Sequence, residues 1–395
     1  MSLIPSERLA QARRLLFVSP LALGDFLYIK TFLAALKQQH PALEVDIWLD
    51  DNRNNQDSWR LSRSKIMQQW IAAEPAFSRS YGCSDSKAMQ DKQVEAAKAL
   101  DYDLVITHSG SKSEQFSALA RRISPKGFIV TSLAKSKFGG LLDPWFFRHS
   151  DKTFKIDVAA LGEQHHITDR YYQLLHRVAG LTLDKSAFMP SLAITPEVTE
   201  TAKAWLSKTF PGQSQGRLYF LNHLSTNKKR DWHQSQLFEL IARLTEQAPD
   251  SRFIVNSTPE NFSALEQAID DEPKLANSQV AVFTVQDNFF ELPAMIAAAD
   301  MVITVETAIM HFATASQRPL IAMMRQKKPY WAPPETASAK VLYASTGKGY
   351  VSDIGVDEVM ATLAQMSGPQ MSGPQMPNTQ ISDDEKPAAH SQLSS

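Results

Sequence analysis

Residues 14–41 read RLLFVSPLALGDFLYIKTFLAALKQQHP, and this stretch decides the fold class. The run from Leu15 to Ser19 is typical of a strand that is buried on both faces of a parallel sheet. The apolar residues that follow recur at helical spacing, at Phe26, Ile29, Leu33 and Leu36. A buried strand followed at once by an amphipathic helix is half of a βαβ unit. Because ligands of open α/β sheets bind beyond the carboxyl ends of the strands, we expect a ligand site at residues 23–25.

Strand-like apolar runs alternate with helical patterns along the rest of the chain, which is typical of α/β layered domains. The predicted strands lie at 14–19, 43–49, 103–107, 127–131, 217–222, 252–256, 279–283, 301–305 and 319–323. Helices are predicted at 165–179, 233–247, 260–270, 291–299 and 307–316. Two longer loop-like stretches lie at 50–57 and 132–157. The two βα series predict two doubly wound Rossmann-like domains, with the ligand site in the cleft between them.

At 395 residues the chain is longer than one hydrophobic core usually supports, so two domains are expected. The predicted division is an N-terminal domain at 1–183, a linker at 184–198, a C-terminal domain at 199–365 and a disordered tail at 366–395. The tail carries a tandem MSGPQ repeat and almost no apolar residues that could pack into a core.

Composition narrows the classes of partner. The formal charge is −1, with acidic and basic residues interspersed, so nucleic acid is not expected as a partner. The single cysteine, Cys83, excludes an intrachain disulfide and a cysteine-based zinc cluster. No secretory signal and no bilayer-spanning apolar stretch are recognisable, so a cytoplasmic location is expected. The N-terminus is basic and amphipathic, so it is a candidate for peripheral contact with the inner face of the cytoplasmic membrane. The residues concerned are Leu3, Ile4, Arg8, Leu9, Arg13 and Arg14.

Asp25 stands at the start of the first predicted long helix, where two roles are open to it. An aspartate at this point caps a helix by accepting hydrogen bonds from backbone N–H groups. The helix dipole and those donors favour its ionised form. An ionised carboxylate in a cleft can also accept the proton of an attacking hydroxyl. The two roles are compatible, and Asp25 is the candidate catalytic base.

Two further segments place polar residues directly after buried strands. Segment 299–319 runs from a strand into a helix that starts near Thr307, and backbone N–H groups there predict an anion site. Segment 219–232 places hydroxyls and then cations after a strand, which is typical of a diphosphate clamp. Two structural alternatives stay open. His311 could be a core histidine bonded to backbone, and the basic run 228–230 could be a solvated loop.

Taken together, these motifs resemble those of glycosyltransferase family 9, the heptosyltransferases. Leu-Gly-Asp at 23–25 is similar to the N-terminal signature of the family, in which the aspartate is the base. Glu-Thr-Ala at 306–308, followed by His311, is similar to its D-T-G/A-x-x-H signature, with glutamate where aspartate is usual. The hydroxyl residues at 225–226 with Arg230 match its K/R-x-W segment. The resemblance implies a GT-B architecture and inverting, metal-independent sugar transfer.

The resemblance also implies the substrates and the site. The expected donor is a nucleotide sugar, ADP-heptose, used as a co-substrate with no resident cofactor. The expected acceptor is an anionic, lipid-linked glycan of the lipopolysaccharide core type. The donor-binding candidates are Ser225, Thr226, Arg230, Glu260, Glu306, Thr307, Ala308 and His311. The acceptor-binding candidates are Gly24, Arg60, Arg63 and Arg122, because an anionic acceptor needs cations in the N-terminal half.

Two rival functions fit the same scaffold. A sugar-nucleotide epimerase or hydrolase would use the same two domains but would convert the donor without an acceptor. A noncatalytic nucleotide-binding or glycan-binding member is suggested by the altered Glu-Thr-Ala signature at 306–308. An assay with donor alone separates the first rival from a transferase. Measurable donor affinity without turnover would identify the second.

Overall fold

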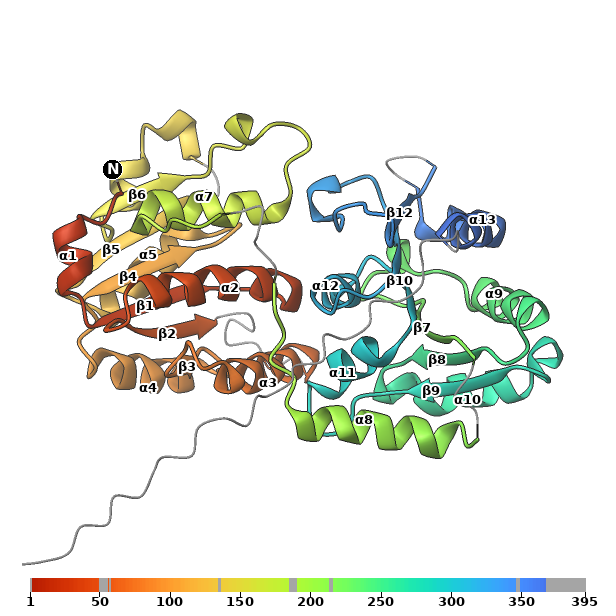
Figure 1. The fold of residues 1–395 in the computed structure, drawn as a ribbon. Helices are drawn as coiled ribbons and strands as arrows, with labels where there is room; N and C mark the ends of the chain where they lie inside the picture. The colour runs from red at the N-terminus through yellow and green to blue at the C-terminus, as the bar shows by residue number, and fades with distance from the viewer. Residues whose placement is uncertain are drawn as a thin grey trace, which may run out of the picture.

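The structure is a computed structural model that describes residues 2–49, 56, 58–133, 136–184, 190–212, 216–345 and 349–366. Within these residues the chain forms two six-stranded parallel sheets, one in each half of the molecule (Figure 1). The strand orders are β3-β2-β1-β4-β5-β6 and β12-β11-β10-β7-β8-β9. The predicted fold of two doubly wound domains is therefore confirmed.

In the N-terminal domain, β1 is the strand of the opening stretch, and its two faces pack against different helices. The strands are β1 (Arg14–Ser19), β2 (Glu44–Leu49), β3 (Ser80–Tyr81), β4 (Leu104–His108), β5 (Phe128–Leu133) and β6 (Lys152–Lys155). The helices are α1 (Ser6–Gln11), α2 (Leu23–Gln39), α3 (Ser58–Ala73), α4 (Lys87–Lys98), α5 (Ser113–Ile123), α6 (Asp143–Phe146) and α7 (Ile167–Ala179). Leu15 and Phe17 pack with α2 and α7, whereas Leu16 and Val18 pack with α4 and α5. This two-sided burial explains the unbroken apolar run.

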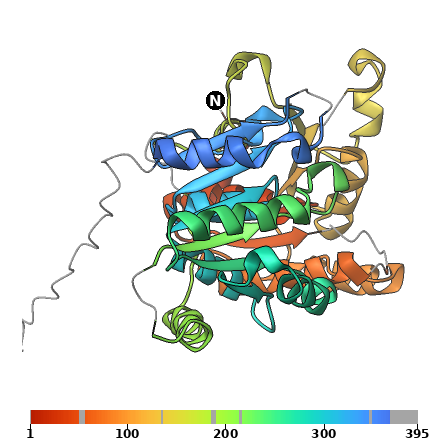
Figure 2. The ribbon, with the colours of Figure 1, turned by 90° about the vertical axis from the view of Figure 1, so that its right-hand side faces the viewer.

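The C-terminal domain repeats the pattern. Its strands are β7 (Leu218–Asn222), β8 (Arg252–Asn256), β9 (Gln279–Phe283), β10 (Met301–Val305), β11 (Leu320–Met324) and β12 (Ala339–Tyr343). Its helices are α8 (Pro196–Thr209), α9 (Gln234–Gln247), α10 (Phe262–Asp270), α11 (Glu291–Ala298), α12 (Ala308–Ala315) and α13 (Val356–Met366). Seen from the outer side of this domain, α13 (blue) and α9 (green) lie side by side over its sheet (Figure 2). The other face of the sheet carries α11 and α12.

All nine predicted strands are present, and the strands that sequence reasoning missed lie at sheet edges. β3 has only two residues, β6 is largely exposed, and β12 is half-buried. Edge strands are often short or charged, so they lack the apolar run that marks a central strand. The predicted loop at 132–157 is wrong in part, because it contains α6 and β6. Most of the predicted loop at 50–57, part of the linker at 185–189 and the tail from 367 lie outside the described residues.

Aromatic side chains join the two domains on one side of the cleft. The ring of Trp70, on α3, stacks on Phe289 with 4.9 Å between centroids and meets Phe312 of α12 edge-on at 5.7 Å. The side-chain carbonyl of Gln69 accepts a hydrogen bond of 3.0 Å from the backbone N–H of Phe289. Because these rings are almost fully buried, one apolar core continues from the first domain into the second. This packing sets how the two sheets face each other.

The N-terminal segment is part of the core. Ile4 is fully buried and Leu9 is 5% exposed. The backbone N–H groups of Leu3 and Ile4 donate hydrogen bonds of 2.9 Å to carbonyl groups at the end of α7. Ile4 and Leu9, two of the apolar residues considered for membrane contact, are therefore packed inside the protein. In the described part of the chain, no helix combines the length and the apolar character needed to cross a bilayer.

Candidate active site

A cleft of about 900 Å³ lies between the two domains, at the carboxyl ends of their strands. From the N-terminal domain it is lined by the turn after β1 and by Arg63 of α3. From the C-terminal domain it is lined by the loops that follow β7, β8, β10 and β11. Its size is typical of pockets that bind small molecules, and it lies where doubly wound domains bind their ligands.

Asp25 is the third residue of α2 and points into this cleft. Its carboxylate accepts a hydrogen bond from the hydroxyl group of Tyr171, on α7. It also accepts hydrogen bonds from the backbone N–H of Ala22, the residue that precedes α2, and from its own N–H. Asp25 therefore caps α2 and faces the cleft at once, which combines the two roles considered from the sequence.

Burial raises the pKa of Asp25 above that of an exposed aspartate. The hydrogen bonds from Tyr171 and Ala22, and the nearby charge of Lys328, lower this pKa but do not outweigh burial. The expectation that the helix start favours the ionised form is thus corrected, because removal from water is the larger effect. A raised pKa makes the ionised carboxylate a stronger proton acceptor, which suits a general base.

Gly24 and His311 bring the two domains into direct contact beside Asp25. A Cβ atom at Gly24 would lie 2.7 Å from Cδ2 of His311, so only glycine fits here without a shift. Nδ1 of His311 shares a hydrogen bond of 2.8 Å with the hydroxyl group of Tyr28, on α2. Burial, with a smaller effect of His166, lowers the pKa of His311 to about 3. His311 is therefore neutral at pH 7, and it bonds to a tyrosine of the opposite domain.

Amide and hydroxyl side chains line the strand ends of the C-terminal domain. Asn222 donates hydrogen bonds of 3.0 Å to Thr304 and 3.4 Å to Thr307, and it accepts one of 3.0 Å from Asn256. The hydroxyl oxygen of Thr307 accepts a hydrogen bond of 3.3 Å from the backbone N–H of Ile309, at the start of α12. The start of α12 faces the cleft, where its positive dipole end favours an anion.

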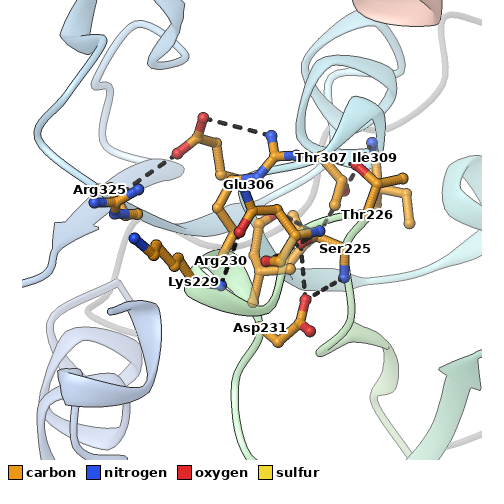
Figure 3. A network of polar contacts seen from close by, with 12 residues as sticks. Ser225, Thr226, Lys229, Arg230, Asp231, Glu306, Thr307, Ile309 and Arg325 are labelled. Atoms are coloured by element: carbon orange, nitrogen blue, oxygen red, sulfur yellow. Dashed lines mark hydrogen bonds and ion pairs between the residues drawn. The ribbon is translucent and has the colours of Figure 1, made fainter. Parts of the chain in front are cut away.

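A short chain of charged groups lies next to this helix start (Figure 3). A guanidinium nitrogen of Arg230 lies 3.7 Å from Oε1 of Glu306, and another donates a hydrogen bond of 3.0 Å to the hydroxyl group of Thr226. Oε2 of Glu306 accepts a hydrogen bond of 3.5 Å from the backbone N–H of Arg325. Nε of Arg230 is buried without a hydrogen-bond partner among the described residues. The guanidinium group thus has donor capacity that the described residues do not use, and Arg230 lines the cleft.

Ser225 is held in place by Asp231. One carboxylate oxygen of Asp231 accepts hydrogen bonds from the backbone N–H of Ser225, at 2.7 Å, and from its hydroxyl group, at 2.8 Å (Figure 3). Arg230 belongs to a short 3₁₀ helix, η4 (Lys228–Arg230), that starts three residues after Ser225. The basic run 228–230 is therefore an ordered turn beside the cleft, although Lys229 itself does not line the cleft. No cluster of three or more His, Cys, Asp and Glu side chains in the described ranges is placed to hold a metal ion.

Residues 96–351, more than half of the chain, match the model of glycosyltransferase family 9 (heptosyltransferase). The chain belongs to this family. It is accordingly a glycosyltransferase. The match begins after Asp25, so the case for that residue rests on its place in the cleft. No curated protein matches the chain at the threshold used.

Solved structures of family 9 glycosyltransferases share the fold. A family 9 glycosyltransferase from Veillonella parvula is 16% identical, with a TM-score of 0.67 over 90% of this chain and 97% of its own. E. coli ADP-heptose LPS heptosyltransferase II is 15% identical, with a TM-score of 0.66 over 89% and 98%. E. coli heptosyltransferase WaaC with ADP-2-deoxy-2-fluoro heptose is 18% identical, with a TM-score of 0.61 over 89% and 99%. At these identities the likeness shows the fold alone.

Most of the candidate residues line the cleft: Gly24, Asp25, Arg63, Ser225, Thr226, Arg230, Glu306, Thr307, Ala308 and His311. Glu260 is not among the lining residues. It is exposed on the short helix η5 (Pro259–Asn261), whose neighbours Thr258 and Asn261 do line the cleft. Arg60 and Arg122 also lie outside the lining, and Arg122 pairs at 2.6 Å with Asp91 across α4 and α5.

Sequence reasoning missed several polar residues of the cleft in this family 9 glycosyltransferase. Asn222 and Asn256 are the last residues of β7 and β8, a position that in itself indicates a ligand site. Lys328 lies in the loop after β11, and Tyr171 lies on α7. These two carried no signal in the sequence, because only the tertiary structure brings them to Asp25.

Proposed function

We propose that this protein is an inverting glycosyltransferase that transfers a heptose from ADP-heptose to a hydroxyl group of an anionic, lipid-linked glycan of the lipopolysaccharide core type. The main support is one geometric relationship. The cleft holds a half-buried carboxylate, Asp25, on one wall and an anion site, made by Arg230 and the start of α12, on the other. The names of two fold neighbours in E. coli, an ADP-heptose LPS heptosyltransferase and a heptosyltransferase with an ADP-heptose analogue, support the choice of donor.

In this proposal the acceptor hydroxyl attacks the anomeric carbon of the sugar from the face opposite the diphosphate. A bond forms between the hydroxyl oxygen and that carbon, and the bond from the carbon to the phosphate oxygen breaks. The proton of the hydroxyl passes to the carboxylate of Asp25, and the electron pair of the broken bond leaves with ADP. Attack from the opposite face inverts the configuration at the anomeric carbon.

The charge that develops on the leaving diphosphate needs compensation from the C-terminal domain. Arg230 lines the cleft, and an arginine fork suits phosphate oxygens. The N–H groups at the start of α12 add partial positive charge. Lys328 also lines the cleft, and its positive charge lowers the pKa of Asp25. These groups act on charge that grows in the transition state.

The N-terminal wall of the cleft, where we place the acceptor, carries fewer cations than the C-terminal wall. Arg63 is the one acceptor-binding candidate with a cation that lines the cleft within the described residues. It lies on α3, in the same domain as Asp25, and is partly exposed. We assign to it the recognition of an anionic group on the acceptor.

The experiment is a transfer assay with purified protein, ADP-heptose and a lipopolysaccharide core acceptor that lacks the heptose. Product mass and ADP release are measured with and without acceptor. We expect an acceptor that is heavier by one heptose, and ADP release that depends on the acceptor. For the Asp25→Asn variant we expect a turnover loss of roughly 10²–10⁴-fold with unchanged donor affinity.

Each rival function gives a different result in the same assay. Donor conversion at full rate without acceptor would identify a hydrolase or epimerase. Donor affinity without turnover on any lipid-linked glycan would identify a noncatalytic binding protein. Near-normal transfer by Asp25→Asn would leave the transferase in place but remove Asp25 as its base.

A further inference from the structure

Three large apolar side chains are exposed together at one tip of the N-terminal domain. Leu141 is 82% exposed, Leu142 is 39% exposed and Trp145 is 62% exposed. Six large apolar residues are exposed in the described part of the chain, and these three fall within five consecutive positions. Exposed apolar residues that occur singly need no explanation, whereas a cluster indicates a surface that meets something apolar. We call residues 141–145 the apolar tip.

The apolar tip is an ordered feature of the fold. It leads into α6, in which Pro144 stands in the first turn, where its missing N–H costs nothing. Phe147, directly after α6, is buried at 6% exposure and anchors the segment to the domain. The rings of Trp145 and Phe146 meet edge-on at 4.9 Å. The chain thus holds Trp145 outward on a turn whose base is fixed in the core.

Cationic residues follow the apolar tip in the sequence, and one of them contacts it. The guanidinium carbon of Arg148 lies 5.4 Å from the ring centre of Trp145. Lys152 and Lys155 are exposed on β6, an edge strand. The one acid between these cations, Asp151, is paired at 2.8 Å with Arg121. The segment that follows the tip therefore carries a surplus of positive charge, while Asp143, within the tip, is half-buried.

The apolar tip lies in the crossover that leads from the carboxyl end of β5 to the start of β6. It follows β5, and the carboxyl ends of parallel strands share one edge of a sheet. Asp25 follows β1 at that same edge, with only β4 between β1 and β5. Figure 1 shows the segment of α6 (yellow) rising above β6 at the top of the N-terminal domain. The crossover that carries the tip thus begins at the sheet edge where Asp25 lies, in the domain to which Asp25 and Arg63 belong.

We propose that the apolar tip inserts into the headgroup region of an anionic lipid bilayer. Exposed leucine and tryptophan side chains next to arginine and lysine are the chemistry of interfacial membrane binding, because the apolar groups enter the acyl boundary while the cations meet lipid phosphates. The flanking cations favour this occupant over an apolar protein surface, which would leave their charges uncompensated. The inference goes beyond the proposed sugar transfer, and its test does not depend on activity.

The test is vesicle flotation with the full chain and two kinds of vesicle. One kind contains phosphatidylethanolamine and phosphatidylglycerol, and the other contains the zwitterionic phosphatidylcholine alone. We expect binding to the anionic vesicles and weak binding to the zwitterionic ones. For the double variant Leu141→Ser, Trp145→Ser we expect binding to anionic vesicles to weaken by about tenfold or more. Circular dichroism confirms that the variant stays folded, and the transfer assay confirms separately whether it is active.

A matched control is Met89→Ser, since Met89 is 42% exposed on α4, away from the apolar tip. It should bind vesicles as the unmodified protein does. The triple variant Arg148→Gln, Lys152→Gln, Lys155→Gln should lose binding to anionic vesicles and keep its weak binding to phosphatidylcholine. Equal vesicle binding by the unmodified protein and the tip variant would overturn the proposal. So would self-association in solution that the tip variant abolishes, because the tip would then be an interface between two copies.

Discussion

The hydroxyl group of Tyr171 donates a hydrogen bond to Oδ1 of Asp25 and so joins α7 to the start of α2. Tyr171 is almost fully buried, and its ring meets His108 edge-on at 5.8 Å. The tyrosine is therefore held in place by packing. It fixes one oxygen of a carboxylate that lines the cleft.

We expect Tyr171→Phe to shift the pH profile of transfer. The hydrogen bond from Tyr171 lowers the pKa of Asp25, while burial raises it and Lys328 lowers it further. Removal of the bond therefore raises this pKa, and because the base acts in its ionised form, the acidic limb of kcat moves to higher pH. We expect kcat at neutral pH to fall roughly tenfold, as a hydrogen bond to a charged group contributes about 1.5–3 kcal/mol.

The readout is kcat against pH for both proteins, with Tyr172→Phe as the control. Tyr172 is the neighbouring tyrosine of α7, and it packs against Phe32. Recovery of the full rate of Tyr171→Phe at high pH would show that the base is intact and only its pKa has moved. An equal loss of kcat at every pH would contradict this role for Tyr171.

We expect Gly24→Ala to disturb the contact between the domains. The added Cβ would lie 2.7 Å from Cδ2 of His311, and His311 cannot withdraw easily because it is buried and bonded to Tyr28. Overpacking of this kind costs about 1–3 kcal/mol. Urea unfolding should therefore show a lower midpoint with an unchanged slope. The double variant Gly24→Ala, His311→Ala should regain part of the lost stability, because the clash is removed. If the losses in the free energy of unfolding of the two single variants simply add in the double variant, the contact between Gly24 and His311 is contradicted.

We expect Arg230→Gln to weaken donor binding and transfer. The change removes the cation that faces the cleft and leaves Glu306 without its ion-pair partner, where it would repel a diphosphate. The KM for the nucleotide sugar should rise by roughly tenfold, and kcat should fall as well, since the charge on the leaving group grows during the reaction. Lys229→Gln is the matched control, because Lys229 is the adjacent cation and does not line the cleft. Equal effects of the two variants would show that the loss comes from the lower positive charge of this region and not from the position of Arg230.

The central strands and the position of Asp25 could be predicted because each depends on local signals. An apolar run marks a strand buried on both faces, and a polar residue directly after it marks the ligand edge. Tyr171 carried no local signal, because its ring is buried and only the tertiary structure brings its hydroxyl group to Asp25. Its partnership with Asp25 spans 146 positions in the sequence. Glu260 shows the opposite error, because a residue next to a strand end can still point to solvent.

A last prediction concerns the buried ion pair between Lys30, on α2, and Glu74. The ammonium group of Lys30 lies 2.6 Å from Oε1 of Glu74, and both side chains are nearly inaccessible to solvent, at 3% and 9% exposure. The same oxygen accepts a hydrogen bond of 2.8 Å from the indole N–H of Trp70, the ring that stacks on Phe289 of the other domain. The pair thus connects the helix of Asp25 to the contact between the domains.

We expect Lys30→Met to destabilise the protein by about 3–5 kcal/mol, because it leaves the carboxylate of Glu74 buried without its cation. The double variant Lys30→Met, Glu74→Gln should recover much of this loss, since no charge then remains buried. The control is Lys203→Met, which removes the cation of an exposed pair with Glu200 and should change stability by less than about 1 kcal/mol. Free energies of unfolding from urea titrations test all three, and a loss for Lys30→Met as small as that for Lys203→Met would mean that the pair does not support α2.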